Sequence, residues 1–190
     1  LGVNGGTIWD KCQGIDQTPI TPYTERKSIS IERTFEKDTI DVNKLNSIIL
    51  AMAENLAFQL RNGVKLTSCA TVKIRYADMN TYSKQKRIPY TSCDRTLIKV
   101  CKDLFRTLYD RRLRVRLVGV RYSHLVHGGH QINFLSDTEQ QCQLYQAMDM
   151  LRKRYGQDAV KRAAAMGSRA IGRVNPFNGE PPIIPAHRRA

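Results

Sequence analysis

The stretch Lys27–Phe35, KSISIERTF, decides the fold that we expect for this chain. Ile29 and Ile31 fall on one side of an extended chain together with the closing phenylalanine, whereas Ser28 and Ser30 fall on the other. β-Branched and aromatic residues suit a pleated surface, and no glycine or proline interrupts the run. The stretch is therefore predicted to be a strand with one buried face and one polar, open face.

The segments that follow are predicted to complete a sheet around this strand. They are a helix capped by Asp41 and ended by Asn62-Gly63, strands at Cys69–Ala77 and Thr81–Ile88, a helix opened by a capping box at Thr91–Asp94, and a strand at Leu113–Ser123. This order is that of the ferredoxin-like split βαββαβ arrangement. The predicted fold class is α+β, a four-stranded antiparallel sheet covered by two helices on one face, in which the first and third strands are central.

Apolar spacing and turn chemistry add detail to this fold. The two helices are expected to bury Leu45, Ile49, Met52, Leu56 and Leu60 in the first and Leu97, Cys101, Leu104 and Leu108 in the second. Pro89 is expected to close the third strand, because proline donates no ladder hydrogen bond. The alternation of the last strand changes phase near Gly119, which predicts a β-bulge there.

Shorter elements are predicted on both sides of this domain. Thr7–Gln13 is expected to form a short helix before an extended linker. A capping box at Ser136–Glu139 opens a third helix. Its predicted buried stripe is Leu144, Met148, Leu151 and Tyr155. Asp158–Met166 is interpreted as one more short helix, and the residues from Gly167 onward are expected to be mostly disordered.

The charge balance indicates the kind of partner. The chain has 31 lysines and arginines against 17 acids, and its formal charge of +14 favours a polyanion, most simply nucleic acid. An anionic membrane is disfavoured, because no basic amphipathic helix rich in Trp or Phe, no membrane-spanning run and no signal peptide is recognised. The five scattered cysteines contain no CxxC pair and are interpreted as free thiols of a reducing cytoplasm.

The open face of the predicted sheet is the candidate nucleic-acid-binding surface, since its hydroxyls and cations can contact phosphates. The candidate residues are Ser28, Ser30, Lys73, Arg75, Lys84, Lys86, Arg114 and Arg116. An ordinary solvated sheet face is the alternative interpretation of the same residues. His124, His127 and His130 lie three apart in a glycine-rich loop without acid or thiol partners, so we predict no metal site there.

Four runs of residues carry a family resemblance: LGVNGGTIWDKCQGID, KSISIERTF, RLRVRLVGVRYSHL and QINFLSD. In this order and spacing they resemble the C-terminal half of bacterial DNA polymerase IV, a Y-family translesion polymerase of the error-prone damage response. The resemblance implies a thumb remnant at 1–16, a linker at 17–26, the DNA-binding little finger domain at 27–125, a loop with a clamp-binding peptide at 126–135, C-terminal helices at 136–166 and a tail at 167–190.

The resemblance also implies roles for residues. The family's little finger contacts mainly DNA backbone, and Arg114 and Arg116 match its basic positions best, whereas Leu117 stands at the second position of a paired basic site. The segment QINFL is similar to the family's sliding-clamp peptide, Gln-Leu-x-Leu-Phe, with the last two hydrophobic residues exchanged. The clamp contacts implied are Gln131, Ile132, Phe134 and Leu135.

The activity implied is that of a parent enzyme rather than of this chain. The family's palm and its acidic metal ligands are not recognised here, so we expect no catalytic residue and no cofactor in the chain, with Mg²⁺ serving the parent DNA-directed DNA polymerase in the bacterial cytoplasm. Two alternatives remain open. One is an RNA-binding module of the same fold, with Tyr82 and Tyr122 as stacking platforms. The other is a protein-docking fragment that acts through QINFL and the last helices.

Overall fold

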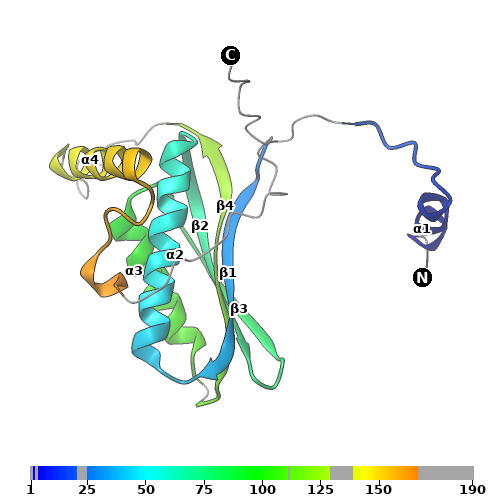
Figure 1. The fold of residues 1–190 in the computed structure, drawn as a ribbon, viewed down its shortest axis with the longest axis horizontal. Helices are drawn as coiled ribbons and strands as arrows, with labels where there is room; N and C mark the ends of the chain where they lie inside the picture. The colour runs from blue at the N-terminus through cyan, green and yellow to red at the C-terminus, as the bar shows by residue number, and fades with distance from the viewer. Residues whose placement is uncertain (1, 3, 21–24, 111, 129–138, 167–190) are drawn as a thin grey trace, which may run out of the picture.

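The computed structural model describes residues 2, 4–20, 25–110, 112–128 and 139–166. Strands β1 (Ser28–Thr39), β2 (Lys65–Tyr76), β3 (Thr81–Thr91) and β4 (Val115–His127) form one antiparallel sheet. Helices α2 (Val42–Asn62) and α3 (Asp94–Leu108) pack on one face of this sheet (Figure 1). The predicted fold class and the βαββαβ order of elements are confirmed.

The strand order β1-β4-β2-β3 differs from the expected one. Strands β4 and β2 are central, so the expectation that the first and third strands are central is wrong. The reason lies in composition: Val115, Leu117, Val118 and Val120 make the first half of β4 apolar and buried, which suits a central strand. Charged strands suit an edge, and β3 carries the run Lys84–Arg87.

The strands are longer than predicted, and their register shifts do not lie at the predicted positions. Pro89 lies inside β3 and does not end it; it falls where the pairing with β2 shifts register, and an edge strand tolerates a proline at such a point. The bulge predicted near Gly119 is wrong by three residues. Tyr76 and Arg75 of β2 pair with Val115 and Leu117 of β4, which leaves Arg116 as the extra residue.

The predicted stripe of α2 forms the centre of the core. All five of its apolar residues are buried, and the Asp41 carboxylate caps the helix by accepting hydrogen bonds from Asn43 N (2.9 Å) and Lys44 N (3.1 Å). In α3, Leu97, Cys101 and Leu104 are buried and Leu108 is partly buried.

The capping box predicted for α3 is wrong. Cys93 is the N-cap and its side chain makes no capping hydrogen bond, while Thr91 Oγ1 accepts from Cys93 N instead. Asp94 is the first helical residue and is fully buried, because its carboxylate pairs with Arg61 of α2. A long-range ion pair therefore takes the position that local capping was expected to fill.

The flanking helices differ from their predicted apolar stripes. Helix α1 (Asn4–Cys12) buries none of its residues. In α4 (Glu139–Tyr155), Leu144, Leu151 and Tyr155 are exposed and Met148 is half-buried, so the predicted stripe is wrong. Among the side chains of α4 that the structure describes, Tyr145 and Arg152 are buried instead, because this helix packs through the polar contacts described below. Gly156, with φ +94°, follows the end of α4 as predicted.

The last predicted helix is not formed, and several other predictions fall on residues that the structure does not describe. Of Asp158–Met166, the structure forms only the 3₁₀ turn η1 (Ala163–Ala165). The clamp peptide Gln131–Leu135, the start of the box at Ser136 and the tail at 167–190 lie outside the described residues. No helix in the described ranges is long and apolar enough to cross a membrane.

Candidate nucleic-acid interface

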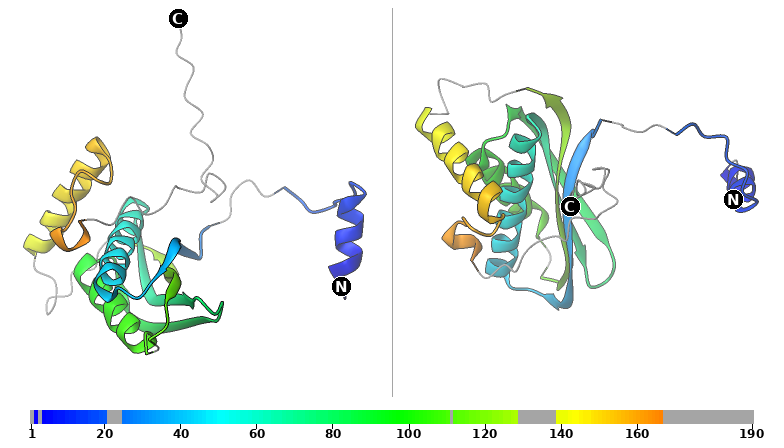
Figure 2. Two further views of the ribbon diagram at one scale, coloured as in Figure 1. Left: turned by 60° about the horizontal axis from the view of Figure 1, so that its bottom comes forward. Right: turned by 45° about the horizontal axis from the view of Figure 1, so that its top comes forward.

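The register of the sheet identifies the side chains that share its open face. Successive rows across β1, β4 and β2 point alternately toward the helices and away from them. The rows that contain the core residues Val72, Ile74, Val118 and Val120 face the helices. The rows that face away hold Ser28, Ser123 and Cys69; Ser30, Arg121 and Thr71; Glu32, Gly119 and Lys73; and Thr34, Leu117 and Arg75. Figure 2 shows that α2 and α3 leave this side of the sheet uncovered.

Four of the predicted residues lie on this open face. Ser28, Ser30, Lys73 and Arg75 all belong to its rows. Two more predicted cations are exposed at one end of the sheet. Arg116 is the bulged residue of β4, and Arg114 precedes β4 and accepts a hydrogen bond at its carbonyl from Ala77 N.

Lys84 and Lys86 do not lie on the open face. They alternate in step with Tyr82 and Ile88, whose side chains pack against the core, so they point to the helix side of the edge strand β3. The prediction treated β3 as if its lysines faced the same way as those of β2, and the sequence alone does not give the relative register of two strands.

Two open-face arginines were missed by the sequence analysis. Arg121, exposed on the central strand β4, lies in one row with Ser30 and Thr71. Arg87, exposed on β3, is paired with Cys69 and so belongs to the adjacent open-face row. The signal for Arg121 was available, because it alternates with the buried Val120 and Tyr122.

Two of the open-face cations already have partners inside the sheet. Lys73 Nζ lies 3.0 and 3.1 Å from the two carboxylate oxygens of Glu32, a contact that reaches from β2 across β4 to β1. Gly119 makes room for it, since a Cβ there would lie 2.8 Å from Glu32 Cγ. Arg75 Nε donates to Thr81 Oγ1 at 2.9 Å. Four other arginines form no ion pair with any described residue and can therefore neutralise the charge of a partner. They are Arg87, Arg114, Arg116 and Arg121.

The RNA-binding alternative depends on aromatic platforms that the structure does not place on the open face. Tyr122 is fully buried, and Tyr82 points to the helix side of the sheet, where it packs edge-on against Tyr76. Base stacking needs an exposed ring. The open face instead offers hydroxyls and cations, which suit phosphates.

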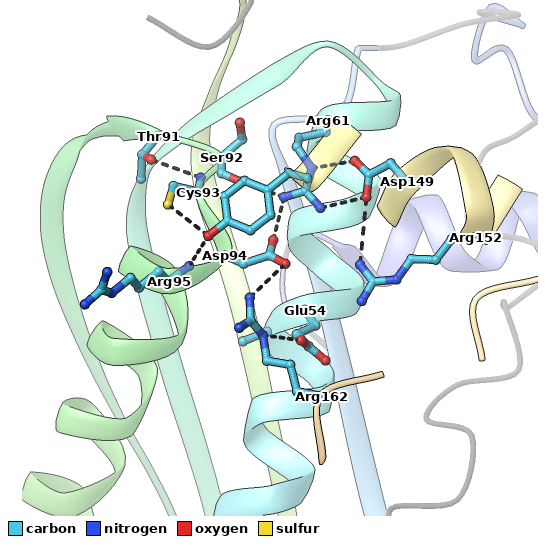
Figure 3. A network of polar contacts seen from close by, with 12 residues as sticks. Glu54, Arg61, Thr91, Ser92, Cys93, Asp94, Arg95, Asp149, Arg152 and Arg162 are labelled. Atoms are coloured by element: carbon cyan, nitrogen blue, oxygen red, sulfur yellow. Dashed lines mark hydrogen bonds and ion pairs between the residues drawn. The ribbon is translucent and has the colours of Figure 1, made fainter. Parts of the chain in front are cut away.

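A second group of charged side chains gathers where α2, α3, α4 and the segment before η1 meet (Figure 3). We call it the buried network: Glu54, Arg61, Asp94, Asp149, Arg152 and Arg162. Arg61 donates to Asp149 through Nε (2.6 Å) and Nη2 (2.9 Å) and to the Ser92 carbonyl through Nη1 (2.9 Å). Arg162 lies between the carboxylates of Glu54 and Asp94, and Arg152 donates to the Val160 carbonyl.

The pKa values in the buried network follow from burial and pairing. Burial alone would lower the pKa of Arg61, but its hydrogen bonds to Asp149 and Asp94 raise that pKa above its usual value. Burial raises the pKa of Glu54, and the positive charge of Arg162 opposes the shift. Three cations face three carboxylates, so the network is neutral overall and has no charge left for a substrate. The network is a structural junction that holds α4 against α2 and α3.

The metal and cysteine predictions are compared here with the part of the chain that the structure describes. In the described ranges no group of three or more His, Cys, Asp or Glu residues could hold a metal ion. His127 Nδ1 lies 2.8 Å from the Val64 carbonyl, and His130 lies outside those ranges. Cys12, Cys69, Cys93 and Cys101 are free thiols, as predicted.

The family is decided by a match over residues 26–134. This stretch matches the model of the impB/mucB/samB family C-terminal domain. The chain belongs to this family. DNA polymerase IV of Clostridium acetobutylicum is 31% identical over 169 residues, covering 86% of this chain and 42% of the relative. DNA polymerase IV of Dehalococcoides mccartyi is 30% identical over 163 residues, covering 85% and 42%. The predicted resemblance to the C-terminal part of a Y-family polymerase is thus confirmed, and the chain spans about two fifths of these relatives.

Solved structures give a more distant likeness. DinB from Sulfolobus solfataricus is 25% identical with a TM-score of 0.46, covering 53% of this chain and 29% of that one. The little finger domain of PolIV, solved with the beta-clamp processivity factor, is 19% identical with a TM-score of 0.44, covering 58% of this chain and 99% of that one.

Proposed function

We propose that the open face binds the DNA backbone without reading its sequence, as the little finger portion of a translesion polymerase would. The observation that carries this proposal is the row Ser30, Arg121 and Thr71, which places an exposed arginine with no ion pair to any described residue between two hydroxyls at the centre of the sheet. Arginine and hydroxyl groups donate to phosphate oxygens, which position a protein on DNA but carry no sequence information.

The distribution of acids supports the same proposal. Glu32 is the one acid in the described open-face rows of β1, β4 and β2, and it is paired with Lys73. The acids of the buried network are enclosed on the other side of the sheet. The exposed cations near the open face are therefore not neutralised by the domain itself, and they attract a polyanion.

The test is the binding of a labelled blunt duplex across a salt series. We expect weak binding that falls steeply with salt for the chain itself. Arg116→Ala/Arg121→Ala should flatten the slope of log K against log salt by about 1.8, or 0.9 for each phosphate that is no longer neutralised. Lys37→Ala/Lys44→Ala removes two exposed cations near the turn from β1 to α2 and should leave the slope unchanged. Equal slopes in all three proteins would overturn the proposal.

We further propose that Gln131–Leu135 docks on a sliding clamp. A short segment with Gln, aliphatic and aromatic residues can fill a small apolar pocket on a partner, and the family resemblance supports this assignment. Phe134→Ala should abolish binding to the clamp and leave duplex affinity unchanged. Full clamp binding by that variant would contradict the assignment. On this proposal DNA synthesis past lesions, with its Mg²⁺, belongs to a parent enzyme, and this chain positions the DNA.

A further inference from the structure

A second basic surface lies over α3, on the helix side of the sheet. Its side chains recur at three- and four-residue spacing and so share one strip of the helix, facing away from the buried Leu97 and Cys101. We call this strip the α3 ridge: Arg95, Lys99, Lys102 and Arg106. Lys102 is half-buried and the other three are exposed.

A groove joins the α3 ridge to the edge strand β3. It has a volume of about 360 Å³ and is lined by Lys86, Arg95 and Lys99. Gln141 of α4 and Asp103 complete its wall. Lys84 alternates in step with Lys86 and therefore points to the same side of β3. The two lysines that were expected on the open face thus extend the α3 ridge.

The cations of this surface form no ion pairs with the described residues of the domain. Neither the four ridge residues nor Lys84 and Lys86 form an ion pair with any described residue, and Asp103 is the one acid that lines the groove. Like charges one helical turn apart repel each other and destabilise a helix by about 0.2–0.5 kcal/mol for each pair. The buried network of the same domain pairs all of its cations, so this surface differs in leaving its charge to an outside anion.

We propose that the α3 ridge and its groove bind a single strand of DNA that continues from the duplex on the open face. The inference rests on the proposed function for the position of the duplex. Along β3, Arg87 points to the open face and Lys84 and Lys86 point to the ridge, so positive charge continues around the edge of the sheet.

The path around this edge selects a single strand. Duplex DNA has a persistence length of about 150 base pairs and cannot turn around one strand of a sheet. A single strand is flexible, and proteins hold it with a basic groove and with aromatic rings on which bases stack. Tyr90, 51% exposed further along β3, provides a ring on the same edge strand.

The experiment compares a blunt duplex with the same duplex carrying a single-stranded overhang of about ten nucleotides, within the usual site size of single-strand grooves. The overhang should tighten binding several-fold and steepen the salt dependence. Lys86→Gln/Lys99→Gln should remove about 1.4 of the added slope, or 0.7 for each phosphate of the single strand, and leave blunt-duplex binding unchanged. The matched control Lys37→Gln/Lys44→Gln should behave like the wild type with both DNAs.

The possible results separate this inference from the proposed function. The inference is overturned if the overhang does not increase the affinity of the wild type. It is also overturned if Lys86→Gln/Lys99→Gln lowers the affinity for both DNAs equally, or if the control variant loses as much affinity. In each case the open-face duplex site stands. If the blunt duplex does not bind but the single strand alone binds in a way that depends on Lys86 and Lys99, the proposed function fails and the ridge remains a single-strand site.

Discussion

The open face and the buried network both contain charged side chains, but these side chains have different roles in the two regions. In the buried network, arginines and carboxylates from different segments of the chain form ion pairs and are mostly shielded from solvent. On the open face, Arg121 and Arg87 are exposed and form no ion pair with the described residues. The number of charges therefore predicts neither role, because pairing and burial decide whether a charge holds the fold together or meets a partner.

The largest expected effect is on the buried side. Asp94→Ala removes the fully buried carboxylate that faces Arg61 and Arg162 and leaves their charges undercompensated. We expect it to lower the free energy of unfolding by about 3–5 kcal/mol, measured by urea denaturation. Asp103→Ala, on the exposed side of the same helix, should change it by less than about 0.5 kcal/mol. Equal effects of the two substitutions would show that the buried network does not hold the domain together.

The next effect tests the contact that neutralises part of the open face. Gly119→Ala places a Cβ against Glu32 Cγ and forces the Glu32–Lys73 pair to move, which should cost about 1 kcal/mol in urea denaturation. In a Glu32→Ala background the clash disappears, so the same substitution should be neutral or stabilising. A cost that persists without the glutamate would mean that Gly119 is required by the backbone instead.

The core under the open face gives a pH dependence. Burial raises the pKa of the Cys101 thiol from an ordinary 9.0 to about 12. The unfolded chain therefore loses this proton first, so stability is full below pH 9 and falls as the pH rises toward 12. Between pH 9 and 10 the loss should be at most about 1 kcal/mol. Cys101→Ala should be less stable at pH 7 but show a flatter decline above pH 9; an unchanged slope would contradict the assignment.

The smallest effect turns a neutralised cation into an available one. Glu32→Gln removes the acid that pairs with Lys73. Duplex DNA should then bind a few-fold more tightly, with the salt slope steeper by about 0.9, while stability changes by less than about 1 kcal/mol. Glu25→Gln, which frees Lys65 outside the open-face rows, is the matched control. If both variants gain equally, net charge alone governs binding.

The accuracy of the sequence predictions followed the range of the interactions. The Asp41 cap, the buried stripe of α2 and the alternation of β1 depend on residues within one turn or one strand, and all are confirmed. The stripe of α4 was wrong because Asp149 and Arg152 bind to side chains and carbonyls of other elements, and this outweighs the burial of Leu144 and Leu151. No local pattern marks a helix that packs through its charges.

The residues of the candidate site also divide into those predicted from local alternation and those that depend on pairing between strands. Ser28, Ser30, Lys73 and Arg75 were predicted from strand alternation alone. Lys84 and Lys86 were assigned to the wrong face, and Arg87 and Arg121 were missed, because a face is shared only once the register between strands is known. A shift of one residue moves every side chain of a strand to the opposite face.

Periodicity and composition were enough to predict the order of the elements, the alternation of β1 and β2 and the excess of positive charge. The tertiary structure decided that β4 and β2 are central, that Glu32 reaches across Gly119 to Lys73, and that the basic residues of β3 divide between the two sides of the sheet. These features arise between residues far apart in the chain, where register and close packing, rather than local preference, choose which side chains meet.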